Sequence, residues 1–143
     1  MRIATWVAGV FGVLAVAPGW ADLAGDLASA RQRWTERGSD DYTFTISQGC
    51  YCPPSSLGPI TVTVIDGKVG RRGHLDPPVA RSSLSITIPL LFDRIDAALR
   101  RYPSATFHWE FDPVDGHPTR FEYDDPGIQD EQSVIIVKDF EHL

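Results

Sequence analysis

Two stretches of the chain repeat their apolar residues at the spacing of a helix. In Ala21–Arg37 this period of three to four positions is carried by Leu23, Leu27, Ala30 and Trp34, with Arg31 at the same spacing. A second helix is predicted to begin after Thr87, a good N-cap residue, because Pro89 suits the first turn. Its apolar stripe consists of Leu91, Phe92, Ile95, Ala98 and Leu99, and Pro103 ends it.

Elsewhere, apolar and polar residues alternate, as in strands that bury one face. The alternation covers residues 42–46, 60–64, 107–111, 119–123 and 133–140. Asp66-Gly67 predicts a two-residue hairpin, since both central positions of such a turn need positive φ. A further strand is therefore expected over about residues 68–74. Asp115-Gly116 predicts another turn.

These elements predict an α+β domain with the order α-β-β-β-α-β-β-β. Short connections favour antiparallel pairing, so we expect an antiparallel sheet with the two helices on one face. The strand aromatics are expected mainly in the core. A second interpretation assigns them to binding, on strands whose other face is open to a partner; the candidate binding residues are Tyr51, Trp109, Phe111 and Tyr123.

The beginning of the chain has the pattern of a secretory signal peptide over residues 1–21. The pattern consists of a basic Arg2, an uncharged apolar run over 3–17, the helix breaker Pro18, and small residues at Gly19 and Ala21. Cleavage is expected after Ala21, which leaves one domain over 22–143. A retained membrane anchor is the alternative, because the apolar run is nearly long enough to span a bilayer.

Composition agrees with a single exported domain that is not inserted in a membrane after cleavage. The 143 residues are 43% hydrophobic and 22% charged, with a formal net charge of −6. These values are typical of one globular domain. An acidic surface disfavours binding to nucleic acid or to anionic lipid. We expect a periplasmic or secreted protein without a cofactor.

Cys50-Tyr51-Cys52 is the most unusual motif. Two lone cysteines in an oxidising compartment usually pair, and at this spacing they pair comfortably only around a tight turn at Tyr51. Three interpretations remain open: a structural clip at the end of a strand, a redox-active pair, and a site for a soft metal such as cuprous copper.

The second half of the chain is rich in acidic turns. The weak candidates for a metal site, Ca²⁺ in particular, are Asp112, Asp115, Asp124 and Asp125. Their spacing does not match an EF-hand loop, and ordinary turn chemistry explains Asp115-Gly116 equally well. Asp112 and His117 are expected to face each other across the hairpin, as an acid/base pair or as a stabilising hydrogen bond. Recognised catalytic motifs are absent from the sequence, so an enzyme is not favoured.

The motifs together resemble a family of exported bacterial proteins, secreted or lipid-anchored, that is known only as a domain of unknown function. The matching features are Trp34, Tyr42-x-Phe44, Cys50-x-Cys52, Val62-x-Val64 before Asp66-Gly67-Lys68-Val69, Thr87 to Phe92, Phe111-Asp112 with Gly116-x-Pro118, Asp124, and Ile136 to Phe140. The resemblance covers roughly Leu27 to Phe140. It implies an exported α+β domain with a recurring cysteine pair and a Gly-x-Pro hairpin, and no activity.

Two functional hypotheses follow. The first is a small, non-catalytic binding or accessory domain that recognises a protein or another component of the cell envelope through its open sheet face. The alternative is a redox-active or metal-handling protein that uses Cys50 and Cys52.

Overall fold

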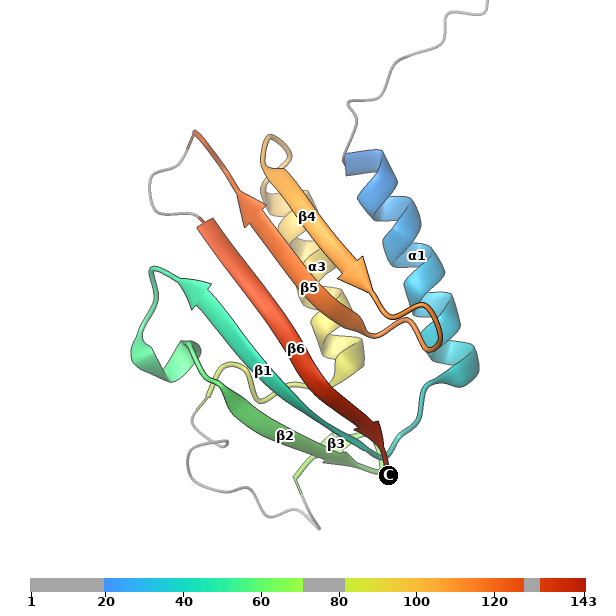
Figure 1. Cartoon of the computed structure of the whole chain (residues 1–143). Coiled ribbons are helices and arrows are strands. Elements are labelled where there is room, and N and C mark those ends of the chain that lie inside the picture. The colour runs from blue at the N-terminus through green and yellow to red at the C-terminus, as the bar shows by residue number, and fades with distance from the viewer. Residues whose placement is uncertain (1–19, 71–81, 128–131) are drawn as a thin grey trace, which may run out of the picture.

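In a computed structural model that describes residues 20–70, 82–127 and 132–143, two helices cover one face of a six-stranded antiparallel sheet (Figure 1). The elements are α1 (Trp20–Arg37), β1 (Tyr42–Cys50), the 3-10 helix η1 (Pro54–Ser56), β2 (Ile60–Ile65), β3 (Lys68–Val69), α3 (Ile88–Arg101), β4 (Thr106–Phe111), β5 (Pro118–Asp124) and β6 (Gln132–His142). The strand order is β3-β2-β1-β6-β5-β4. The predicted fold class and element order are confirmed.

The start of α1 bears on the predicted signal peptide, most of which lies outside the described residues. The expected cleavage point after Ala21 falls in the first turn of α1. Leu23 is already fully buried in the core, so cleavage there would keep every described core residue of the helix. No helix within the described ranges has the length and apolarity to cross a bilayer.

The hairpin between β2 and β3 forms as predicted. Asp66 and Gly67 have φ values of 52° and 71°. Both values are positive, as the two central residues of this hairpin turn require. Val64 pairs with Val69 and Ile65 with Lys68. The strand β3 ends at Val69, and the rest of its expected range, from residue 71 onwards, lies outside the described residues.

The core lies between the helices and one face of the sheet, where the strand aromatics gather. Phe44, Phe107 and Phe121 are buried there. Neighbouring residues of a strand face opposite sides, so the other face is mostly polar, with Val134 and Ile136 half-buried in its middle. Its polar residues are Thr43, Thr45, Thr61, Thr63, His108, Glu110, Arg120 and Glu122. The expectation of an open face suited to recognition by aromatic residues is therefore wrong, because the same alternation that exposes threonines and charges turns the aromatic rings inward.

A buried hydrogen bond fixes the start of α3 on the sheet. The Ile88 backbone N–H donates to the Tyr42 hydroxyl at 2.9 Å. Thr87 caps the helix as predicted, because its side chain accepts a hydrogen bond from the Leu90 N–H. Burial raises the pKa of Tyr42 to about 12, so the phenol stays neutral at physiological pH.

Tyr42→Phe tests this anchor. Removal of the hydroxyl leaves the Ile88 N–H buried without a partner, which costs about 1–3 kcal/mol of unfolding free energy. Urea unfolding followed by circular dichroism measures the loss. Tyr123→Phe is the matched control, because its hydroxyl has no hydrogen-bond partner among the described residues. Equal stability of the two variants would contradict the anchoring role of Tyr42.

Candidate functional site

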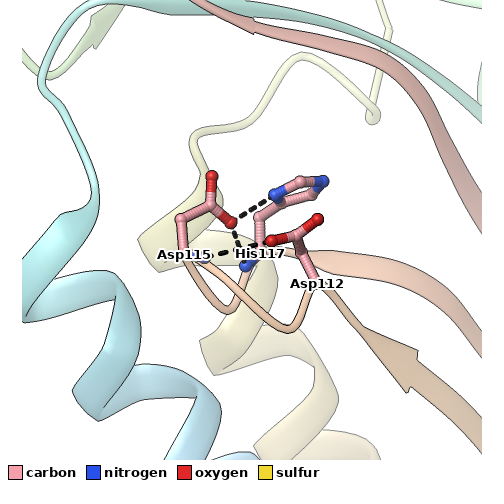
Figure 2. A group of neighbouring side chains, drawn as sticks. All are labelled: Asp112, Asp115 and His117. Atoms are coloured by element: carbon pink, nitrogen blue, oxygen red, sulfur yellow. Dashed lines mark hydrogen bonds and ion pairs between the residues drawn. The ribbon is translucent and has the colours of Figure 1, made fainter.

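A tight turn between β4 and β5 is organised by the carboxylate of Asp112. Its Oδ1 accepts hydrogen bonds from the backbone N–H groups of Val114, at 2.8 Å, and Asp115, at 3.0 Å. The Asp112 backbone N–H also donates to the His117 carbonyl at 2.8 Å. These bonds hold residues 112–117 in one conformation, and Figure 2 shows the three ionisable side chains of the turn.

Gly116 lets this turn lie directly against α1. Its φ is 82°, a conformation that side chains rarely adopt. A Cβ at this position would lie only 2.2 Å from the Ala30 carbonyl oxygen in α1. Glycine is therefore required for two reasons, the backbone conformation and the close approach, and the turn is positioned by contact with the helix backbone.

Asp115 is a buried carboxylate that bridges two histidines. Its Oδ1 contacts His117 Nδ1 at 2.5 Å and its Oδ2 contacts His142 Nε2 at 2.9 Å. Its Oδ1 also accepts the His117 backbone N–H at 3.0 Å. Asp115 is 5% exposed and His117 6%. Both carboxylate oxygens are occupied, so the group joins the turn to the end of β6.

The environment of Asp115 favours its charged form. Burial by itself raises the pKa of this carboxyl group, but the hydrogen bonds and charge of His117 together with the hydrogen bond of His142 outweigh it. The net result is a pKa below the ordinary value of aspartate. Asp115 is thus an ionised, satisfied group rather than a protonated acid.

Aromatic rings cover the two histidines. The ring of His117 stacks on Phe140 with centroids 4.0 Å apart, and Phe140 stacks on Tyr42 with centroids 5.4 Å apart. The ring of Trp34, from α1, is stacked on His142 with centroids 6.3 Å apart. The cluster packs the end of α1, the start of β1 and the end of β6 together, which makes it a structural latch.

The sequence pointed to a different partner for His117. We expected Asp112 and His117 to interact, and they do so through their backbones, while the His117 side chain contacts Asp115 instead. The Asp112 carboxylate is directed to the turn N–H groups. His142 was not identified from the sequence, because the alternation had predicted a strand that ended at Phe140.

Of the four candidate metal ligands, the structure brings only Asp112 and Asp115 together. Ligand atoms of Asp112, Asp115 and His117 lie within 4.8 Å of one another, but a cation would have to displace the hydrogen bonds that build the turn. Asp124 is exposed at the far end of β5, about 20 Å away at 3.3 Å per residue. Asp125 is buried and accepts the Gly127 N–H at 2.9 Å. The four aspartates therefore cannot surround one ion.

The cysteine motif forms an exposed tip where β1 ends. A disulfide joins Cys50 to Cys52 with a Cα–Cα distance of 5.3 Å, within the usual range. The intervening Tyr51 is 87% exposed. Pro53 and Pro54 follow it and are exposed too. We call Tyr51, Pro53 and Pro54, with the disulfide, the tip.

The other candidate binding residues are half-buried on the helix-covered face. Trp109 donates its indole N–H to Asp26 of α1 at 2.7 Å. Phe111 packs against Phe92 with centroids 6.2 Å apart. Tyr123 stacks on Tyr102 with centroids 4.8 Å apart. The structure therefore brings none of the three beside Tyr51 in a common exposed aromatic surface.

Asp115→Asn tests the latch. Because the folded pKa is lowered, the carboxylate contributes stability above the unfolded pKa of about 4, and this contribution is lost as the pH falls through the folded value. The variant is expected to lose about 2 kcal/mol at pH 7. It should also lose less stability than the unaltered protein between neutral and acidic pH.

Urea unfolding at a series of pH values measures both effects, with exposed Asp124→Asn as the control. Parallel pH profiles for Asp115→Asn and the unaltered protein would show that the carboxylate contributes nothing to acid sensitivity.

Comparisons with known proteins place the chain in a family without assigning an activity. No curated protein and no solved structure matches it. A family model described as a family of unknown function, DUF6174, matches residues 26–142. This range includes the turn at Asp112, the tip, all of α3, and α1 without its first turns. The chain therefore belongs to the DUF6174 family of unknown function.

Proposed function

We propose that this protein is an exported, non-catalytic binding domain that recognises a protein of the cell envelope through the tip. One observation carries the proposal: a tyrosine that is 87% exposed is held between two bonded cysteines. Exposed tyrosines are enriched among the residues that dominate binding energy in protein interfaces.

The tip is suited to binding because it has little freedom to lose. The disulfide restrains the backbone on both sides of Tyr51. The φ angles of Pro53 and Pro54 are restricted by their rings. A preorganised segment binds more tightly, because less conformational entropy is lost on association. The side chain of tyrosine adds a large contact area with few rotatable bonds.

The remainder of the proposal comes from the chemistry of the chain. The cysteine pair supports export, because disulfides persist in oxidising compartments. The apolar segment before Ala21 supports it independently. The occupied oxygens of Asp115 and the turn-bound Asp112 support a non-catalytic role.

Tyr51→Ala tests recognition by the tip. We expect the variant to capture at least tenfold less of the partner from an envelope extract of the native host than the unaltered protein does. The reason is that a central interface tyrosine contributes about 2 kcal/mol or more to the binding free energy. Quantitative mass spectrometry after cross-linking and affinity capture measures the retention.

Val114→Ala is the matched control, since Val114 is also exposed, at 60%, but lies in the turn at the other end of the sheet. Capture that is equal for both variants, or that falls equally in both, would overturn the assignment of the tip.

The intact mass of the protein isolated from its native host tests export. We expect a chain that begins at Asp22 and is about 2 Da lighter than its reduced form, since one disulfide removes two hydrogens. A chain that still carries Met1, with both thiols free, would contradict the proposal.

A further inference from the structure

A cationic groove lies between α3 and the sheet. Its wall on the helix includes Arg94 and Arg101, which are two turns apart, and its other side includes Gln48 and Ser133. The groove has a volume of about 190 Å³. Ser133, which lines the groove, pairs with Cys50 in the sheet register, so this part of the groove lies at the end of the sheet that carries the tip.

The two arginines of the groove have no acidic partner in the part of the chain that the structure describes. The other ion pairs of α3 are complete, because Asp93 contacts Arg31 at 2.9 Å and Asp96 contacts Arg100. In contrast, Arg94 donates to the Ser83 carbonyl at 2.8 Å, and the Arg101 guanidinium lies 5.4 Å from the centroid of the Tyr102 ring. Within the described residues, no carboxylate pairs with either arginine.

Of the two arginines, Arg94 is the one whose positive charge is disfavoured by burial. Burial lowers the pKa of its guanidinium, and no charged group compensates. A half-buried cation whose acceptor is a carbonyl gains more from an incoming carboxylate than a fully exposed cation does. The local positive charge is also unusual in a chain whose formal net charge is −6.

The dimensions favour a segment of a protein over a small molecule. Pockets for metabolites usually measure about 300–1,000 Å³, which is larger than the 190 Å³ available here. Arg94 and Arg101 are separated by about 10 Å along the helix axis at 1.5 Å per residue, which suits carboxylates spread along an extended chain. The stacked rings of Tyr102, which follows α3, and Tyr123, from β5, add an apolar surface to the lining of the groove.

We infer that the groove binds an acidic peptide segment of the protein partner, with carboxylates on Arg94 and Arg101 and its neighbouring residues against Tyr102 and Tyr123. The inference rests on the proposed function, because it assigns the groove to the partner that contacts the tip. The carboxylates supply the negative charge that neither guanidinium group contacts among the described residues, and the tip sets which protein is recognised.

The probe that tests the groove is a short capped peptide of alternating glutamate and tyrosine, compared with the same peptide carrying glutamine in place of glutamate. The glutamate peptide is expected to bind and to shift the NMR amide signals of Gln48, Ser133 and Arg101. Arg94→Gln and Arg101→Gln are each expected to raise the Kd about tenfold, because each variant loses one charge-assisted hydrogen bond. Added salt should weaken binding further.

Arg100→Gln is the matched control, since Arg100 lies on the same helix but is paired with Asp96, and its Kd should change less than twofold. Binding of the glutamine peptide with equal affinity, or equal Kd values in all three variants, would overturn the inference. Displacement of the peptide by inorganic phosphate at the same concentration would also overturn it, by showing a simple anion site.

The capture experiment separates this inference from the function on which it rests. Loss of the partner in Tyr51→Ala, with full retention in the double variant Arg94→Gln/Arg101→Gln, would leave the tip in place and overturn the groove. Peptide binding in the groove with unchanged capture by Tyr51→Ala would support the groove and overturn recognition by the tip.

Discussion

The antiparallel pairing of β1 with β6 holds the two halves of the chain in a single sheet. It is the only seam in the strand order at which the first three strands meet the last three, among the described residues. At one end it places Cys50 opposite Ser133, and at the other it places Tyr42 opposite His142. The groove and the latch at Asp115 depend on this register, because each combines residues from both halves.

The two ends of the sheet differ in how their charges are satisfied. At the end that holds the turn, Asp115 is buried but receives hydrogen bonds from both histidines, so a charged group is stabilised inside the protein. In the groove, Arg94 is half-buried and donates to the Ser83 carbonyl, and no carboxylate among the described residues pairs with it. A buried charge whose hydrogen bonds are complete contributes to stability, whereas a half-buried charge without a counter-charge can gain energy from a charged ligand. This contrast separates the structural site from the proposed binding site.

Much of the fold could be predicted because its signals are local. Thr87 and Pro89 mark a helix start within a few residues, and Asp66-Gly67 marks a hairpin by its own backbone preferences. The alternation of Phe44 with threonines indicates which side of β1 is buried. The candidate site was predictable only in part: Tyr51 between two cysteines was apparent from the motif, whereas His142 lies 27 positions from Asp115 and belongs to no local pattern.

The sequence by itself determined the elements, their order, the inward position of the strand aromatics and the possibility of a bond between Cys50 and Cys52, because helix period, strand alternation, turn preferences and short loops act over a few residues. Only the tertiary structure decided that Asp115 meets His142 and that Gly116 touches the backbone of α1. It also decided that Arg94 and Arg101 line one groove without a carboxylate partner among the described residues. These relations depend on sheet register and helix placement, which bring together residues that are distant in the chain.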